Sequence, residues 1–462
     1  MWKTLCQAIS AQIGEDRIVK PEDAAGRLIS VTGEAMPPVP VLRPRDTGEL
    51  AKALEICTAH KTPVIPLGGS TGLVGGLRHS GNEVYLSLEL MNRIESIDPV
   101  NRVATVQAGV VLQTLHQAVE DAGLSFPVDL GARGSATIGG LISTNAGGEK
   151  AFRFGMMREQ VLGLEVVTAS GQVLDLSNAM IKNNTGYDLK HLFIGAEGTL
   201  GIVTRVQLRL RPQLPNVKTA FALIPDFASA LELRNRVEAA LGNDLTAFEV
   251  MWPEVYEMTT RHRTGRLPLP LTSGIYLLFE SEAGTARDPE AFETAMAALY
   301  EDGLVEDMAI AASQADRRDM WAIRNDIEAI IRTLSPLLAF DISLPVSSMQ
   351  RCVEELDKEL KAKWPETRLA RFGHLGDNNL HIVVTIGEDT MRKKSDISTI
   401  VYNRVIASNG CISAEHGIGV DKLPWFEMGK ASAATALMQI IRIALDPNSI
   451  LNPGKTIPSA AS

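Results

Sequence analysis

Two histidines and a later Glu-His pair could together bind a metal ion. His374 and His381 are separated by a Gly-Asp-Asn-Asn segment at residues 376–379, a composition typical of a tight turn. We therefore expect a hairpin that places both imidazoles side by side. Glu415 and His416 follow in a glycine-flanked loop, and two His with one Glu are a usual catalytic zinc set that leaves one position open. Histidines that are only hydrogen-bonded within the hairpin are the alternative.

A glycine-rich stretch at residues 66–76 could bind phosphate. It follows the apolar residues 63–65 and has glycine at 68, 69, 72, 75 and 76, which lets backbone N–H groups approach an anion closely. It lacks the Gly-Lys-Ser/Thr ending of a P-loop and the Gly-x-Gly-x-x-Gly of a Rossmann unit. With no lysine in the loop, neutral backbone donors would hold the anion. A glycine hairpin that binds nothing remains open.

Two further stretches repeat this chemistry. Residues 127–148 are rich in glycine, small residues and hydroxyls, with few charges, and residues 183–204 contain Glu197 followed by Gly198. Such stretches suit close backbone contact with a large flat ligand and its phosphates better than a packed core.

The elements that position these residues alternate between strand and helix patterns, so we expect an α+β fold. We predict domains at 1–215, 216–405 and 406–462. A helix-start signal at residues 46–49, which begins with Asp46, precedes an expected helix at 50–57. The other expected helices cover residues 4–13, 111–122, 227–241, 289–300, 316–333, 348–363 and 431–444; the expected strands cover 84–88, 103–109, 206–210, 219–224, 274–280 and 340–345.

Arg324 lies within the expected helix 316–333. Its planar fork suits a carboxylate ligand. The structural alternative is an i,i+4 ion pair with Glu328 on the same helix, which contributes only about 0.2–0.5 kcal/mol.

Composition excludes several classes of function. The chain has 462 residues, 45% hydrophobic and 22% charged, with 45 Lys plus Arg against 55 Asp plus Glu and a net charge of −10. No basic run suggests a nucleic-acid partner. The four cysteines lie far apart without a Cys-x-x-Cys, so neither disulfides nor a thiolate metal site is expected. Without a signal peptide or an apolar run of about 18 residues, we expect a soluble, cytoplasmic protein with no transmembrane segment.

The three glycine stretches, in this order, resemble the FAD-binding domain of the vanillyl-alcohol oxidase and p-cresol methylhydroxylase superfamily, in its D-lactate dehydrogenase and D-2-hydroxyglutarate dehydrogenase branch. The resemblance covers nearly the whole chain and implies a two-part FAD-binding domain, a substrate (cap) domain and a C-terminal segment that returns to the flavin. FAD would be non-covalent, because the first loop carries no nucleophilic histidine, although His79 lies just beyond it. The implied FAD-binding residues are Pro66, Gly68, Gly69, Ser70, Thr71, Gly72, Gly75, Gly76, Pro127, Asp129, Leu130, Gly131, Gly134, Ser135, Thr137, Ile138, Gly139, Gly140, Ser143, Thr144, Asn145, Gly147, Gly148, Glu197, Gly198, Gly201, Ile202, Val203 and Asn452. A plain helix stop explains the Pro and Gly around Asn452 equally well.

The resemblance also implies an activity, the oxidation of a D-2-hydroxy acid to the 2-oxo acid with hydride transfer to flavin N5. Zinc on His374, His381 and Glu415 would assist loss of the hydroxyl proton. His416 would be the general base, and Arg324 would bind the substrate carboxylate. The electron acceptor would be a quinone or an electron-transfer flavoprotein, and a homodimer remains open.

The substrate is expected to differ from 2-hydroxyglutarate. In the 2-hydroxyglutarate enzymes of this branch, a threonine lies one turn after the arginine, a lysine two residues before the Asp of the next strand, and an asparagine two residues after the second histidine. Here these positions hold Glu328, Ala339 and Val383. Each change removes a polar partner for a second carboxylate, and Glu328 would repel one. We therefore expect a D-lactate-like substrate, with 2-hydroxyglutarate as the alternative.

Two other classes of function remain open from the residues. One is a zinc hydrolase without flavin that uses the His/His/Glu set. The other is a flavin-bearing electron carrier without turnover.

Overall fold

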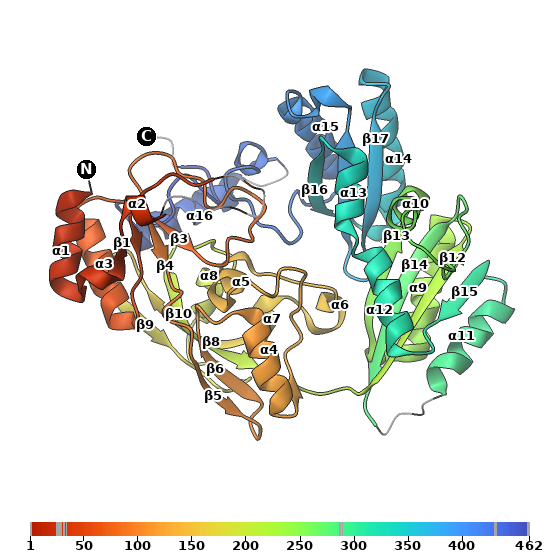
Figure 1. Ribbon diagram of the computed structural model, residues 1–462, viewed down its shortest axis with the longest axis horizontal. Helices are drawn as coiled ribbons and strands as arrows, with labels where there is room; N and C mark the ends of the chain where they lie inside the picture. Colours follow the sequence, from red (N-terminus) through yellow and green to blue (C-terminus); the bar gives the residue numbers. More distant parts are fainter. Residues whose placement is uncertain are drawn as a thin grey trace. The chain divides into compact units, whose positions relative to one another are not determined.

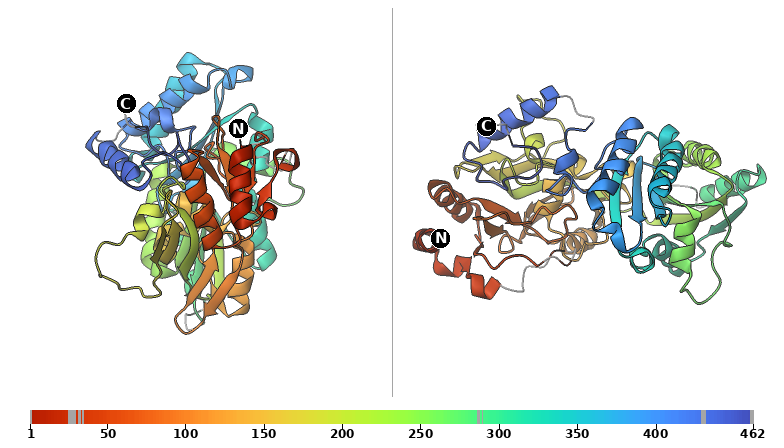
Figure 2. Two further views of the ribbon diagram at one scale, coloured as in Figure 1. Left: turned by 90° about the vertical axis from the view of Figure 1, so that its left-hand side faces the viewer. Right: turned by 90° about the horizontal axis from the view of Figure 1, so that it is seen from above.

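The computed structural model describes residues 2–24, 30, 33, 35–285, 288, 290–428 and 432–459. The chain divides into two compact units. The first comprises Met1–Gly148, Gly155–Gln213 and Glu415–Ser462, and the second comprises Glu149–Phe154 and Leu214–Ala414. Both mix helices and sheets (Figures 1 and 2), which confirms the predicted α+β class. The expected domain boundaries at 215 and 405 compare with changes of unit after residues 213 and 414.

Among its described residues, the first unit contains three sheets. Their strand orders are β1-β2-β4-β3, β5-β6-β10-β8-β9 and β11-β7. The strands are β1 (Ile18–Val19), β2 (Val41–Leu42), β3 (Val64–Leu67), β4 (Val84–Ser87), β5 (Ile94–Asp98), β6 (Val103–Gln107), β7 (Leu124–Ser125), β8 (Val161–Val167), β9 (Val173–Leu176), β10 (Ile202–Arg209) and β11 (Arg211–Pro212). The helices are α1 (Lys3–Ile13), η1 (Glu15–Arg17), α2 (Pro21–Ala24), α3 (Thr47–Ala59), α4 (Leu112–Asp121), α5 (Ile138–Thr144), α7 (Met157–Gln160), α8 (Lys190–Phe193), η4 (Leu423–Trp425) and α16 (Ser432–Leu445).

The first sheet delivers the first glycine stretch. Asp46 caps α3 by accepting a hydrogen bond from the Glu49 N–H at 2.9 Å, and α1 and α3 lie side by side in the left view of Figure 2. α3 connects β2 to β3, and both strands run parallel to β4. β3 ends where the glycine loop begins. The C-terminal segment returns to this strand, because the Val64 N–H donates to the Ile450 carbonyl at 2.8 Å.

The second sheet of this unit supports the other two glycine stretches. β10 pairs with β6 and β8 in antiparallel register. One hydrophobic cluster joins this sheet to α4 and α5, with Val206, Leu115 and Ile142 fully buried. α5 thereby fixes the middle of the second stretch against β10, the strand that begins at the end of the third.

The second unit is built on one antiparallel sheet with the order β15-β12-β14-β13-β17-β18-β16. Its strands are β12 (Asn216–Ile224), β13 (Leu245–Met251), β14 (Ile275–Ala283), β15 (Asp307–Ile310), β16 (Leu338–Ser343), β17 (Arg368–His374) and β18 (Asn379–Thr385). Its helices are α6 (Ala151–Phe154), α9 (Phe227–Leu241), η2 (Gly242–Asp244), α10 (Pro253–Thr260), α11 (Ala291–Glu301), α12 (Gln314–Arg324), α13 (Ile327–Leu334), α14 (Val346–Lys363), η3 (Glu388–Thr390) and α15 (Lys394–Ala407).

The two faces of this sheet pack against different helices (Figure 1). On one face, Phe248 stacks on Phe279 at 5.2 Å, and Phe279 contacts Phe292 of α11. On the other face, a hydrophobic cluster joins the strands to α10, α12 and α13 through residues that include Tyr256 and Trp321. Because side chains alternate along a strand, Glu249 points to this second face.

The expected helix 316–333 is wrong, because the structure has two helices, α12 and α13, with a break at residues 325–326. Asp326 starts α13 by accepting a hydrogen bond from the Ala329 N–H at 3.0 Å. Of the other expected helices, 289–300 and 431–444 begin at Pro289 and Ala431, which lie outside the described residues; the structure has α11 and α16 there.

Candidate functional site

The first glycine stretch lies against the second at Gly68 and Gly69, where little or no room is left for a side chain. A Cβ atom added at Gly69 would lie 1.9 Å from the Ser135 carbonyl oxygen, and one at Gly68 would lie 3.0 Å from Thr137 Oγ1. Within the described part of the chain, no group accepts a hydrogen bond from the backbone N–H groups of residues 69–76. These N–H groups are available to an anion, as a phosphate cradle requires.

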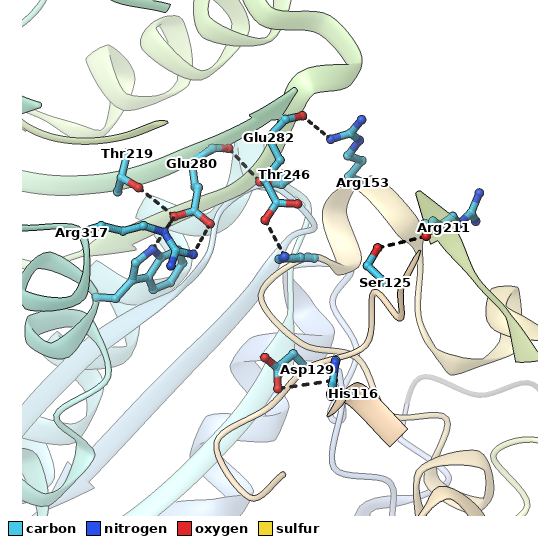
Figure 3. Close-up of polar contacts among 12 residues, drawn as sticks. His116, Ser125, Asp129, Arg153, Arg211, Thr219, Thr246, Glu280, Glu282 and Arg317 are labelled. Atoms are coloured by element: carbon cyan, nitrogen blue, oxygen red, sulfur yellow. Dashed lines mark hydrogen bonds and ion pairs between the residues drawn. The ribbon is translucent and has the colours of Figure 1, made fainter. Parts of the chain in front are cut away.

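The second stretch is held by local hydrogen bonds and by one close backbone approach. Thr137 caps α5 by accepting from the Gly140 N–H at 3.3 Å, and a Cβ atom added at Gly148 would lie 1.9 Å from the Asp129 carbonyl oxygen. Asp129 accepts from Arg133 Nη1 at 2.6 Å, and His116 Nε2 lies 3.9 Å from its carboxylate (Figure 3). The loop before α5 is therefore ordered by its own side chains.

The third stretch meets the C-terminal segment at Glu197. Its carboxylate accepts from the N–H groups of Ile418 and Gly419 at 2.8 and 2.9 Å. Asn452 Nδ2 donates to the Glu197 carbonyl at 2.8 Å, and Lys455 Nζ donates to Asn452 Oδ1 at 2.8 Å. Burial raises the pKa of the Glu197 carboxyl, against the lowering effect of the two N–H donors. A plain helix stop at Asn452 does not account for its hydrogen bonds with Glu197 and Lys455.

All predicted FAD-binding residues belong to the first unit. They lie at the end of β3 and in the loop after it, in the segment that leads into α5, on α5 and just after it, at residues 197–203, and at Asn452. The side chains of Ile138, Ile202 and Val203 are buried in hydrophobic clusters. These three residues therefore offer little or no surface to a ligand and instead support the stretches on which they lie.

His79, which lies just beyond the first glycine stretch, is held by Glu83. Its Nε2 atom lies 2.9 Å from the Glu83 carbonyl oxygen and 3.3 Å from Glu83 Oε2. The ring is thus committed to a turn that Glu83 also closes through the Ser80 and Gly81 N–H groups.

Replacing Gly69 with alanine is expected to destabilise the first unit by about 1–3 kcal/mol, because a well-packed loop must move to admit the methyl group. The FAD content of the purified protein is expected to fall with it. Gly72→Ala is the matched control: a Cβ atom there meets nothing within 4 Å, so its effect on stability should stay within about 0.5 kcal/mol. Urea unfolding of the FAD-free proteins measures the stability of both variants. Equal stability of the two variants would contradict the close packing of Gly69 against Ser135.

Lys455 was missed by the sequence analysis, although a lysine after Asn-Pro-Gly near a chain end could have indicated it. Its side chain is almost fully buried, and burial lowers its pKa from 10.5 to about 8. Between these values the unfolded chain binds the proton and the folded chain does not. Folding stability should therefore rise between pH 8 and pH 10.5, and the burial penalty is fully present below pH 8.

Lys455→Met is expected to remove this rise, which amounts to up to about 3 kcal/mol. Urea unfolding from pH 7.5 to 10 compares it with the wild-type chain and with Lys52→Met, whose lysine is half-exposed on α3. A pH dependence shared by all three proteins would show that other groups cause it.

In the second unit, the predicted hairpin of the histidine pair is present. β17 and β18 are antiparallel, with Phe372 opposite His381, so His374, two residues after Phe372, shares that face. The two imidazole rings lie 5.4 Å apart between centroids and are nearly perpendicular. Both rings can therefore offer a nitrogen to one ligand.

Arg324 is bound to a carboxylate that the sequence analysis did not select. Its Nε and Nη2 atoms lie 2.8 and 2.7 Å from Glu249 Oε2, and Nη1 donates to Asn325 Oδ1 at 3.2 Å. The predicted alternative, an ion pair with Glu328, is wrong: Glu328 lies on the next helix and pairs with Arg332 at 3.9 Å. One side of the guanidinium is thus already occupied.

Glu249 also binds His374, whose Nδ1 atom lies 2.7 Å from Glu249 Oε1. Burial raises the pKa of Glu249, but Arg324 and His374 outweigh it and hold the pKa below its ordinary value. A single acid in an otherwise uncharged strand was the only signal in the sequence.

Two more carboxylates surround this group. Glu149 accepts from Asn325 Nδ2 at 2.8 Å, and burial raises its pKa, with Glu249 adding to the effect. Burial raises the pKa of Asp377 to about 6, again with a contribution from Glu249. This part of the second unit therefore resists additional negative charge.

Glu415 and His416 begin the segment of the first unit that follows residue 414, whereas His374 and His381 belong to the second. In the second unit, Cys411 pairs with Ser343 at the end of β16 through hydrogen bonds of 2.8 and 3.1 Å. In the first unit, a Cβ atom added at Gly417 would lie 2.7 Å from Glu197 Oε1. His416 is thus next in sequence to a residue that packs on Glu197.

Comparisons with known proteins identify one family model that covers most of the second unit and another that covers part of the first. The chain matches the family model of the FAD linked oxidases, C-terminal domain, over residues 213–456, and that of an FAD binding domain over residues 38–177. It is 39% identical over 423 residues to a probable mitochondrial D-2-hydroxyglutarate dehydrogenase of Oryza sativa, covering 91% of this chain and 75% of the relative. It is 36% identical to a D-2-hydroxyglutarate dehydrogenase of Xanthomonas citri, covering 90% and 89%.

Solved structures support the fold. p-Cresol methylhydroxylase has a TM-score of 0.78 at 15% identity, covering 98% of this chain and 96% of that one. Alkyldihydroxyacetonephosphate synthase has a TM-score of 0.76 at 16% identity, covering 98% and 85%. Among the described residues, no helix combines the length and apolar character needed to cross a membrane.

The first two glycine stretches lie within residues 38–177, which match the FAD-binding family model, and the relative from Oryza sativa matches 91% of the chain. The chain belongs to the FAD-linked oxidases, in the family of the D-2-hydroxyglutarate dehydrogenases, and is an FAD-dependent oxidoreductase.

Proposed function

We propose that the protein is a dehydrogenase that oxidises a D-2-hydroxy acid with a short or apolar side chain, such as D-lactate, to the 2-oxo acid. The observation that carries the proposal is the histidine pair on one face of the second unit, next to a buried arginine, in a chain of this family. Family membership favours this function over a zinc hydrolase without flavin.

The first unit fits FAD. Its backbone N–H groups at residues 69–76 suit a pyrophosphate, and the close approaches at Gly69 and Gly148 pack the glycine-rich segments against their neighbouring backbone. Bound FAD would supply a hydride acceptor at N5 of its ring. The engagement of His79 by Glu83 favours non-covalent binding.

The residues also fit a divalent metal, with zinc as the leading candidate. His374 and His381 offer imidazoles, and Glu415 would offer a carboxylate. Chain connectivity supports this set: Cys411 is fixed beside β16, β16 pairs with the strand of His381, and Glu415 lies four residues later, a reach of at most about 14 Å. The metal would supply a Lewis acid that lowers the pKa of a substrate hydroxyl.

The remaining roles fall to the protein's own side chains. His416 would accept the hydroxyl proton, since imidazole titrates near neutral pH. Arg324 would bind the substrate carboxylate through Nη1, because Glu249 occupies its Nε and Nη2 side. This differs from the expected two-pronged contact and makes the carboxylate contact weaker.

Two positions on the sheet of the second unit support a substrate without a second carboxylate. Ala339 and Val383 lie directly opposite each other, two residues from the opposed pair Asp341 and His381, so all four share a face. Neither Ala339 nor Val383 offers a polar group. Burial raises the pKa of the Glu149 and Asp377 carboxyls, and the charge of Glu249 adds to this effect. Glu328 contributes less than expected, because its side chain is 88% exposed in the second unit.

D-2-Hydroxyglutarate is the second candidate, favoured by the names of the relatives. The electron acceptor, proposed to be a quinone or an electron-transfer flavoprotein, the homodimer and the cytoplasmic location remain proposals. The plant and animal relatives are named mitochondrial, whereas the bacterial ones carry no such word.

Anaerobic absorbance of the bound flavin tests the function. D-Lactate is expected to bleach the flavin band faster than D-2-hydroxyglutarate does, their L enantiomers should leave it unchanged, and prior treatment with a chelator should abolish bleaching. Fastest bleaching by D-2-hydroxyglutarate would promote the second candidate. A flavin that no hydroxy acid reduces would favour an electron carrier without turnover.

A further inference from the structure

Glu249 carries a carboxylate at a position in the fold where burial destabilises a charged side chain. It is the only charged residue of β13, a central strand, and it is completely buried. A buried carboxylate is stable only when it is paired and hydrogen-bonded. Both of its oxygens are used, and both partners belong to the proposed site: Oε1 faces His374, and Oε2 faces Arg324.

These contacts determine which nitrogen of His374 carries the proton. An ionised carboxylate only accepts hydrogen bonds, so the His374 Nδ1 atom must be the donor to Glu249. On the other side of the ring, Arg324 Nη2 lies 3.4 Å from Nε2. A guanidinium only donates, so Nε2 must present its lone pair. Both neighbours therefore select the same tautomer.

We infer that Glu249 is a positioning residue that holds His374 as the Nδ1–H tautomer, with Nε2 ready to bind a metal, and fixes Arg324 beside it. A metal-binding histidine commonly donates its other N–H to a carboxylate, which sets both the tautomer and the ring orientation. The inference rests on the proposed function, because it assigns this role to one of the proposed metal ligands.

The charge of Glu249 has a second effect. Paired with Glu249, Arg324 forms a neutral unit next to His374. Without the carboxylate, an uncompensated guanidinium would lie 3.4 Å from the ligand nitrogen and repel a divalent cation. Loss of Glu249 therefore weakens metal binding through both the tautomer and the local charge.

Glu280 provides a matched control on the neighbouring strand. It lies opposite Ala247, so it shares the face of Glu249, and it is also buried. It binds Arg317 through Nε and Nη2 at 2.7 and 2.8 Å and accepts from Thr219 at 2.8 Å (Figure 3). Among the described contacts of Glu280, none involves a histidine.

The test measures zinc retention by the FAD-loaded protein during dialysis against a series of buffered free-zinc concentrations. Glu249→Gln is expected to weaken the apparent Kd for zinc about 10–100-fold, with FAD content unchanged. Glu280→Gln should lose comparable stability and keep zinc affinity within twofold of the wild-type chain. If Glu249→Gln does not fold, Glu249→Asp keeps the charge and is expected to show a smaller loss of zinc affinity.

His374→Ala distinguishes the proposed role of Glu249 from the proposed metal site itself. Loss of zinc in this variant, combined with wild-type affinity in Glu249→Gln or its Asp replacement, would overturn the role of Glu249 and leave the proposed function standing. A wild-type chain that retains no zinc would overturn both.

Discussion

The His381→Ala variant is expected to lose zinc and to lower kcat/KM for its D-2-hydroxy acid by at least about 10³-fold while keeping its FAD. The proposed Lewis acid contributes several kcal/mol to the barrier, and 4 kcal/mol corresponds to about 10³ in rate. His381 lies on β18 with its ring 5.1 Å from that of Phe372, and its Nδ1 atom lies 3.9 Å from Asp341. It is partly exposed rather than a core residue, so its removal should cost little stability.

His262→Ala is the control, because His262 is an exposed histidine of the same unit. Zinc content, flavin absorbance and steady-state kinetics are measured on both variants. Activity of His381→Ala within tenfold of the wild-type chain would remove the metal from the proposed mechanism. Loss of FAD together with zinc would instead indicate a general folding defect.

Local patterns predicted the parts of this site that local physics determines. A Gly-Asp-Asn-Asn turn between apolar flanks predicted the β17–β18 hairpin, and with it the shared face of the two histidines. The Asp46 cap marked the start of α3 before the glycine loop. The α+β class followed from the alternation of such elements.

Long-range pairing could not be predicted in the same way. Glu249 is 75 residues from Arg324 and 125 from His374, and no spacing rule links residues at such separations. The break between α12 and α13 depends on capping by Asp326, which competes with a helical pattern that continues across it. Residues 149–154 belong to the second unit because α6 contacts β13. No pattern in their own sequence predicts these contacts.

The substrate preference is expected to respond to two substitutions on the second unit. Ala339→Lys combined with Val383→Asn should raise kcat/KM for D-2-hydroxyglutarate by about 10²-fold, because a hydrogen bond to a charged group contributes about 1.5–3 kcal/mol. The two positions lie opposite each other across β16 and β18, next to the His381 pair. Ala339 is exposed in this unit and can accept a lysine, whereas Val383 is buried and its replacement should cost some stability.

Ala362→Lys is the control for added positive charge alone, because Ala362 is exposed on α14. It should leave the ratio of kcat/KM values for D-2-hydroxyglutarate and D-lactate within about twofold of the wild-type ratio, as is usual for a surface change. Glu328→Thr should also change the ratio by less than about fivefold, since an exposed charge is screened by solvent.

The ratio of the two kcat/KM values decides the question better than either value alone. A loss of stability or of metal lowers turnover of both substrates, so it cancels in the ratio, whereas a partner for the second carboxylate acts on one substrate only. A ratio that shifts towards D-2-hydroxyglutarate only in the Ala339→Lys, Val383→Asn variant would locate substrate selection on this face of the sheet. A wild-type chain that already prefers D-2-hydroxyglutarate would mean that its second carboxylate is bound elsewhere, and the carboxylates Glu149 and Asp377 would then have to be protonated or turned away when it binds.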